Sequence, residues 1–553
     1  MNKRFKSILV IIGIIMLATS CTDHFNNMNT DPNKPTPDAT DPKFEFIYAQ
    51  SRSMLYSSQW QVGDQMTVDH FCEFAANDPL SSSDYSIDSR YIQGIWDLTY
   101  VSLSNFNSII RNQESNPRNV NVVQMSKIWK VWLMLRLTDY LGDIPYSQAA
   151  NAEATNPKYD TQKDIYYKMF EELTDATSKL TTGEGNIGTY DLAFSGDIIK
   201  WKKFANSLRL RMALRIADVD NAKAKTEAAA AIAGGVMTSA SDAAQVRMGD
   251  ASSETASQSP LYYHRNQSVI HMSTAYYKLV NNFGGIAWPT IADQKTNTNI
   301  TKAIVEAKIH PTKVDPRAIF HFEPSGVTEK VATQSLFGNW AGTEPGNVSS
   351  AVGASMITGQ KQADYAKIGE FYYKSPNRPY SVLKYSEVCF LQAIAIVKGI
   401  ISTGDAKALY EAGVRDNMAE FGISATIVDK YLSSSDKNTY GTSPKYDDNI
   451  GTCNTALDKI LTQKWLSHFV EGSFEAWADH RQYHKPTLMP FEHVNESSFT
   501  MSSSDKTNNT PNAYIKRGYY PSSEVSVNKA NLEEAIARMG SNSIQNNVWW
   551  DVK

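Results

Sequence analysis

Apolar residues recur at the spacing of an α-helix in four stretches of the first half of this chain, and this periodicity limits the possible folds more than any other feature. The first stripe repeats every three or four residues and consists of Ile92, Ile95, Trp96, Thr99, Leu103, Phe106 and Ile110. Further stripes begin at Met125, Ile165 and Trp201. Because amphipathic helices at this density bury their stripes against one another, the sequence predicts a mainly α-helical fold.

The helices are expected to form pairs with short polar connections, as in a scaffold of tetratricopeptide-type helical hairpins. Residues 44–235 and 381–553 are predicted to supply this scaffold, the second part with additional loops. Residues 236–380 differ, because Gly, Pro, Ser, Asn and Thr are frequent there and periodic pieces are short. Irregular segments of this length usually carry function or are disordered, so 236–380 is predicted to be a loop-rich, irregular subdomain that binds a ligand.

The first 20 residues are typical of a secretory signal peptide. Basic residues precede an apolar run from Ile8 to Ala18, which is too short to cross a bilayer as a helix, and small residues then lead to Cys21. This order resembles a bacterial lipobox, in which the cysteine is lipidated and becomes the mature N-terminus. We expect a signal peptide over 1–20, a lipid anchor on Cys21 and a polar tether over 21–43; the alternative is a plain secreted protein.

Charge and cysteine content argue against two classes of protein. The chain has 54 Lys+Arg and 58 Asp+Glu, and removal of residues 1–20 takes away three positive charges, so the mature chain carries 51 − 58 = −7. Nucleic-acid-binding proteins concentrate positive charge, so nucleic acid is not an expected partner. Four cysteines are too few for a disulfide scaffold in a chain of this length. The basic run from Lys200 to Arg215 is expected to form a solvated or salt-bridged helix face.

Eight motifs follow one another in a specific order. The first contains Gly142-Asp143-Ile144-Pro145-Tyr146 after Asp139 and Tyr140. The others lie at Pro157–Gln162, Gly196–Arg211, Asp315-Pro316-Arg317, Tyr385–Leu391, Ile460–Trp465, Glu475–Asp479 and Arg517–Glu524. Together they resemble the SusD/RagB family of nutrient-binding outer-membrane lipoproteins. Gln392-Ala393-Ile394 departs from the Ala-Glu-Ala run that this family usually has, on a helix assigned to the scaffold.

The resemblance implies a lipid-anchored, surface-exposed protein of the outer membrane. It would bind nutrient oligosaccharide without altering it and deliver it to a SusC-like TonB-dependent transporter. The basic run could then also contact this barrel. Alternatives are a peptide-binding receptor of the same family, a glycan-degrading enzyme that uses two carboxylates in an aromatic cleft, and a helical-repeat scaffold that binds only other proteins. No cofactor and no metal are expected.

Sugar rings present C–H faces that stack on aromatic side chains, while polar neighbours bind the hydroxyl groups. The candidates for ligand contact are aromatic and polar residues in the irregular parts of the sequence: Trp60, Asn77, Asp78, Tyr262, Tyr263, Asn266, Trp288, Phe337, Asn339 and Trp340. By contrast, Trp96, Trp129, Trp132, Trp201 and Trp465 lie on helical stripes and are predicted to belong to the core.

Three other patterns have structural interpretations. Gly142 and Pro145 are predicted to end a helix and form a turn, not a ligand site. The Gly183–Gly188 segment has the glycine spacing of a dinucleotide-binding loop, but it follows a helical stripe instead of a strand. His480 and His484 are spaced for one helical face, yet Arg481 stands where a zinc protease has its glutamate, so ordinary packed histidines are expected.

Overall fold

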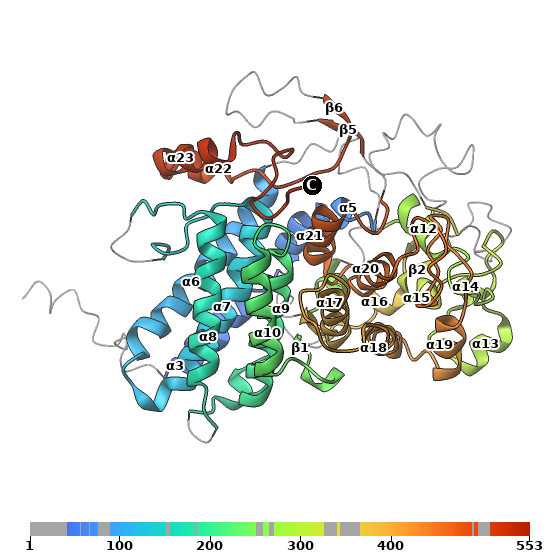
Figure 1. The fold of residues 1–553 in the computed structure, drawn as a ribbon, viewed down its shortest axis with the longest axis horizontal. Coiled ribbons are helices and arrows are strands. Elements are labelled where there is room, and N and C mark those ends of the chain that lie inside the picture. The colour runs from blue at the N-terminus through green and yellow to red at the C-terminus, as the bar shows by residue number, and fades with distance from the viewer. Residues whose placement is uncertain are drawn as a thin grey trace, which may run out of the picture.

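The structure of the chain is a computed structural model. It describes residues 41–55, 57–65, 67–75, 89–150, 155–182, 185–249, 258–264, 270–325, 340–342, 365–488, 491–495 and 509–553. Within these ranges the protein is mainly α-helical, which confirms the predicted fold class, and its strands are short (Figure 1).

The first scaffold region is an array of antiparallel helices in which neighbours in sequence pack side by side (Figure 1). Its helices are α3 (Pro42–Arg52), α6 (Ser89–Gln113), α7 (Val120–Leu141), α8 (Gln162–Lys179), α9 (Ile198–Arg215) and α10 (Asn221–Gly234). Side-chain caps fix several of the starts: Asp197, for example, accepts hydrogen bonds from the first backbone N–H groups of α9. The four predicted stripes correspond to α6, α7, α8 and α9.

Helix α7 is the centre of this region, because nearly every residue along it is buried. The indole of Trp129 is fully buried and lies 5.8 Å from that of Trp201 on α9. The helix ends at Gly142, whose φ of 88° favours glycine, and Thr138 Oγ1 donates a hydrogen bond of 2.7 Å to Gly142 O. The predicted turn after this helix is therefore confirmed.

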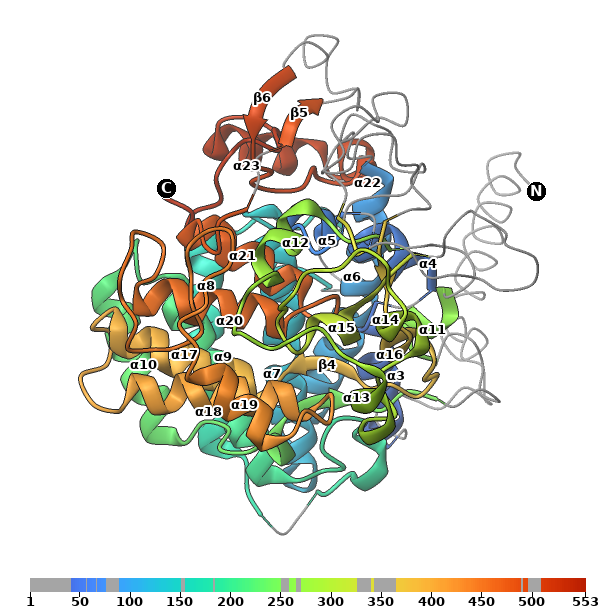
Figure 2. The same cartoon turned by 90° about the vertical axis from the view of Figure 1, so that its right-hand side faces the viewer.

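The second helical region consists of α17 (Tyr385–Val397), α18 (Ala406–Ala419), α19 (Ala425–Leu432), α20 (Ala456–Ser467) and α21 (Ser473–Tyr483). Helix α17 packs against α18, α20 and α9, as Figure 2 also shows for α17, α18 and α20. It is buried along most of its length, and Cys389 lies within this core. An apolar helix of this kind needs neighbours on all sides, which these contacts supply.

The intervening segment is built from short pieces. They are β1 (Ala244–Val246), α11 (Pro260–His264), α12 (Thr274–Val280), α13 (Ile291–Thr296), α14 (Lys302–Val305), α15 (Ala318–His321), β2 (Phe322–Glu323), β3 (Lys367–Ile368), α16 (Glu370–Tyr373) and β4 (Tyr380–Leu383). β1 pairs antiparallel with β4, and β2 with β3. The short pieces agree with the predicted lack of long periodicity.

The remaining elements connect and cover the two helical regions. They are α4 (Ser57–Trp60), the π-helix η1 (Gln61–Gln65), α5 (Val68–Phe71), η2 (Pro117–Asn119), η3 (Gly188–Tyr190), η4 (Ala240–Asp242), β5 (Phe491–Asn495), β6 (Asn509–Ala513), α22 (Ser522–Val527) and α23 (Lys529–Met539). β5 and β6 pair antiparallel and lie with α22 and α23 at one end of the molecule (Figures 1 and 2). Across the described ranges, none of the helices is both long enough and apolar enough to span a membrane.

Candidate functional site

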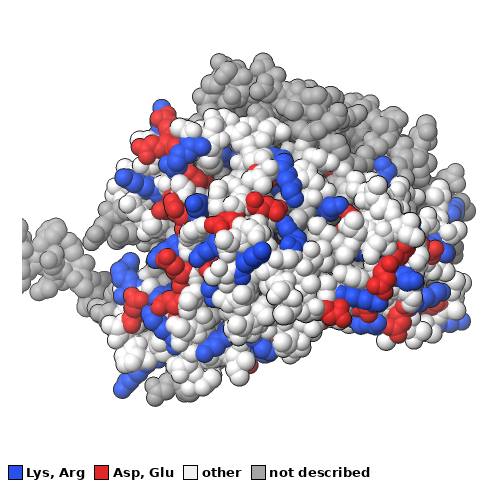
Figure 3. All heavy atoms as spheres, in the orientation of Figure 1, with Lys and Arg blue, Asp and Glu red and all other residues white. Residues whose placement is uncertain are grey.

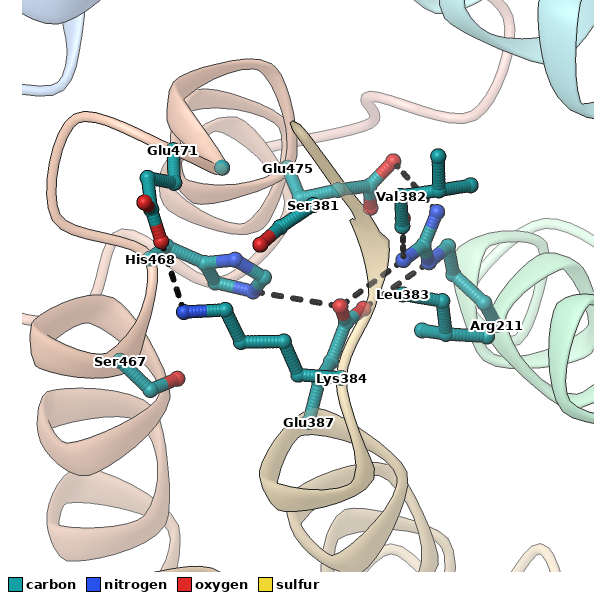
Figure 4. Close-up of a pocket in the computed structure, with 11 residues that line it drawn as sticks. Arg211, Ser381, Val382, Leu383, Lys384, Glu387, Ser467, His468, Glu471 and Glu475 are labelled. Carbon is teal, nitrogen blue, oxygen red and sulfur yellow. Dashed lines mark hydrogen bonds and ion pairs between the residues drawn. The ribbon is translucent and has the colours of Figure 1, made fainter. Parts of the chain in front are cut away.

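A group of buried charges lies where α9, α17, α20 and α21 meet (Figure 4). Arg211 of α9 binds Glu387 of α17 through two parallel hydrogen bonds, with N···O distances of 2.9 and 2.8 Å. Both side chains are 3% exposed. A bidentate pair of this kind is strongly directional, so it fixes α9 against α17.

The same charge cluster extends along α21. Arg215 donates to Glu475 at 2.9 Å and lies 3.2 Å from Asp479, while Lys464 of α20 also binds Asp479. The basic run was predicted to be solvated or salt-bridged. For Arg211 and Arg215 the salt bridges are confirmed, and the solvated face is not found, because each of these side chains is only 3% exposed.

Two glutamates that line the cavity of this cluster are held in their ionised form by basic neighbours. Burial alone would raise the pKa of Glu471, but Arg378 and Lys384 lower it to about 2. Arg211 and Arg215 likewise lower the pKa of Glu475 against the effect of burial. The cavity between these groups measures about 30 Å³, room for water but not for a sugar ring. We assign the cluster a structural role.

A larger hollow of about 270 Å³ opens on the surface between α6, α7 and α8. Its lysines already have acidic partners: Lys127 lies 3.0 Å from Asp175, and Lys130 lies 2.9 Å from Glu172. None of the described residues that line it carries an aromatic ring. Charges of both signs are also interspersed across the face that Figure 3 shows. This hollow therefore lacks the flat apolar face on which sugar rings stack.

Two of the predicted ligand residues lie near each other at α4 and α11. Trp60 is 3% exposed and stacks on His264, with ring centroids 5.7 Å apart and an interplanar angle of 26°. Tyr263 meets the same histidine edge-on at 4.7 Å and is half-buried, as is Tyr262. The structure thus brings Trp60 and Tyr263 together through His264, which the sequence did not single out.

Trp288 and Trp340 form a second pair, with ring centroids 5.0 Å apart at an angle of 70°. The Nε1 of Trp288 donates to Ile304 O at 2.9 Å, and that of Trp340 donates to Asn281 Oδ1 at 3.2 Å. Both indoles are buried, with exposures of 7% and 1%. A third ring, that of His310, lies flat on Trp288 at a centroid distance of 4.9 Å and an angle of 13°.

The remaining candidates, Asn77, Asp78, Asn266, Phe337 and Asn339, lie outside the described residues, as does Cys21. The sequence missed His264 and His310, because no spacing along the chain relates either histidine to its tryptophan.

All five tryptophans assigned to the core are buried, as predicted. Among the described residues there is no group of three or more His, Cys, Asp or Glu side chains that could hold a metal ion. The rings of His480 and His484 lie tilted to each other at 6.0 Å, and His480 meets Tyr514 edge-on at 4.9 Å.

Comparisons with known proteins agree on one family. Residues 39–506 match the SusD-like family model described as starch-binding and associating with the outer membrane. The solved structure of a SusD homolog from Parabacteroides distasonis has 29% sequence identity and a TM-score of 0.80, and the match covers 93% of this chain and 98% of that one. No protein with a curated description matches significantly.

Two further solved structures extend the similarity. One, named a chitin-binding protein, has 25% identity and a TM-score of 0.70, with coverage of 93% of this chain and 100% of that one. The other, a chitin-binding SusD homolog from Flavobacterium johnsoniae, shares the fold at 23% identity and a TM-score of 0.70, with coverage of 93% and 99%. The similarity therefore spans nearly the whole of each protein.

Proposed function

This chain belongs to the SusD-like family, and we propose that it is a lipid-anchored protein of the outer-membrane surface that binds nutrient oligosaccharide. The observation that carries the proposal is the family match over residues 39–506. The similarity to a protein named as chitin-binding supports a carbohydrate as the ligand class. The sequence around Cys21, which resembles a lipobox, supports the anchor.

In this proposal the chain captures the sugar and passes it to a SusC-like TonB-dependent transporter without cleaving it. The charge cluster supports a non-catalytic role, because its carboxylates are paired with arginine or lysine and its cavity is too small for a sugar ring. The transfer requires only modest affinity, since a receptor of this kind must release its ligand. Two or three aromatic stacks of about 0.5 to 1.5 kcal/mol each supply affinity of that order.

The burial of Trp60, Trp288 and Trp340 supports a second candidate, a peptide-binding receptor of the same architecture. Stacking on a sugar needs an indole face that the ligand can reach, whereas peptide recognition by a helical scaffold does not. The two candidates differ in the ligand that the purified chain retains.

Capture of the neighbouring proteins and a ligand screen test the proposal together. The full-length chain is expressed in its native outer membrane with an affinity tag, and we expect a transporter barrel to co-purify with it. The purified chain is then applied to a glycan array and to a peptide library. We expect retention of at least one glycan class with no change in the mass of the glycan; peptide retention alone would favour the second candidate, and cleavage of the glycan would contradict both.

A Cys21→Ser variant serves as the matched control for the anchor. We expect it to leave the membrane fraction while its glycan retention stays unchanged, because the substitution removes only the thiol that is acylated. Recovery of this variant in the membrane fraction to the same extent as the native chain would contradict the lipid anchor.

A further inference from the structure

Within the part of the chain that the structure describes, Trp288 has two ring neighbours, and only one of them, His310, is exposed to solvent. Trp340, the second ring neighbour of Trp288, is 1% exposed, whereas His310 is an exposed residue. Ile309 and Ile291 nearby in the sequence are also exposed, at 47% and 63%. By comparison, His264 on Trp60 is itself only 4% exposed. Of the two tryptophan–histidine stacks among the described residues, that of Trp288 has its histidine on the protein surface and that of Trp60 does not.

The backbone around this stack is held on both sides. Trp288 N donates to Thr312 O at 3.0 Å, and Val314 N donates to Ile286 O at 2.9 Å, so the two segments form a short antiparallel ladder. On the other side, Trp340 N donates to Ile309 O at 2.8 Å. The imidazole itself has one hydrogen-bond contact, between Nδ1 and Pro311 O at 2.9 Å. The His310 ring can therefore leave the indole by side-chain rotation while the backbone stays in place.

We propose that the face of Trp288 now covered by His310 is a binding subsite for a pyranose ring, and that His310 is its displaceable cover. This inference rests on the proposed carbohydrate-binding function and locates one subsite of it. A flat ring lying parallel to an indole occupies the position that the C–H face of a sugar takes when it stacks. The site is close to α13 and α14, which lie at one end of the molecule in Figure 1.

The Trp288 indole stays in place when its covered face is freed, because its other contacts do not involve His310. The indole is held rigidly, by the hydrogen bond from Nε1 to Ile304 O and by the edge contact with Trp340.

Because His310 and the sugar compete for one face, the apparent affinity depends on the fraction of molecules in which the face is free. Removal of the imidazole frees the face in all molecules. We expect the His310→Ala variant to bind sugar about fivefold more tightly than the native chain, the factor that corresponds to a stack of ordinary strength. The His310→Phe variant keeps a ring over the indole and is expected to show no such gain.

The test measures the dissociation constants of maltohexaose and chitohexaose by calorimetry for the native chain and four variants. His310→Ala and His310→Phe differ in whether a ring covers the face. Trp288→Leu removes the face and is expected to weaken binding more than tenfold, and its melting temperature is measured alongside. Lys308→Ala, at an exposed neighbouring position, is the matched control and is expected to bind as the native chain does.

Tighter binding by His310→Ala than by His310→Phe supports the subsite even if Trp288→Leu does not fold. Sugar binding that is equal in the native chain, His310→Ala and His310→Phe overturns the subsite and leaves the proposed function intact. Failure of every variant, including His310→Ala, to bind either sugar counts against the subsite and the proposed function together.

Discussion

At the scale of single residues, Asp64 in the π-helix η1 has an unusual environment for a carboxyl group. Its side chain is 5% exposed, and its Oδ1 has no hydrogen-bond partner among the described residues. Burial raises its pKa to about 7, although Arg136 and Ser473 act in the opposite direction. The pKa of Asp69 is also raised, mainly by burial and to a lesser extent by the nearby Asp64. The hydrogen bond that Ser473 donates to Asp69 acts in the opposite direction. The two carboxyl groups therefore resist joint ionisation.

The raised pKa predicts how the Asp64→Asn variant changes stability with pH. The folded chain keeps a proton on Asp64 up to about pH 7, whereas the unfolded chain loses it near pH 3.8. The stabilisation that this proton gives is complete below pH 3.8 and is lost as the pH rises toward 7. Asparagine is neutral at every pH, so we expect the variant to gain on the order of 4 kcal/mol in unfolding free energy at pH 8 and little at pH 4.

Urea unfolding of both chains at pH 4 and pH 8 checks this expectation. Asp447→Asn is the control, because Asp447 is 58% exposed and its ion pair with Lys407 lies on the surface, where such pairs contribute little to stability. Equal differences between Asp64→Asn and the native chain at the two pH values would show that Asp64 does not hold its proton in the folded state.

At the scale of elements, α17 and α18 approach each other closely at Gly413. A Cβ atom at Gly413 of α18 would lie 2.6 Å from Cε1 of Phe390 on α17. Phe390 is fully buried, so its ring has no free space into which to move. Glycine normally weakens a helix interior by about 1 kcal/mol, and here the close approach explains its presence.

We therefore expect Gly413→Ala to destabilise the chain by about 1 to 3 kcal/mol, even though alanine favours a helix. Chemical unfolding measures the loss. The double variant Gly413→Ala with Phe390→Leu provides the control, because the smaller side chain removes the clash and the two effects should not add. A stabilising Gly413→Ala substitution would mean that the two helices do not approach as closely as the structure shows.

At the scale of the whole molecule, the end of the chain returns to the first helical region. Trp550 is fully buried and its Nε1 donates to Asp139 Oδ1 of α7 at 2.8 Å. The Arg481 guanidinium of α21 lies between two indoles, 3.6 Å from the ring centroid of Trp477 and 4.7 Å from that of Trp550. Trp550 thus connects the C-terminus, the first helical region and the second.

Trp550→Ala is expected to lower the unfolding free energy by about 3 to 5 kcal/mol, since it leaves a cavity and uncovers one side of a buried guanidinium. Calorimetric melting measures this effect. Trp549→Ala is the matched control, because Trp549 is only half-buried and its structural hydrogen bond, to Gln162, comes from the backbone N–H. Equal losses from the two substitutions would contradict the central position of Trp550.

Periodicity and turn chemistry act between residues that are close in sequence, and these features could be predicted from the sequence. The stripe of α6, the apolar α17 and the turn at Gly142 are all examples. The ordered motifs likewise indicated the family, because their residues and their order can be read directly from the sequence.

Partnerships between distant residues were decided only by the tertiary structure. Arg211 pairs with Glu387, which is 176 residues away in the sequence. This part of the basic run, which was expected to form a solvated or salt-bridged helix face, is therefore a buried ion pair. His310 covers Trp288 through a ladder between two irregular segments that carry no periodic signal. Local sequence determines which helices and turns form, but whether a ring or a charge is exposed depends on which distant segments of the chain pack against it.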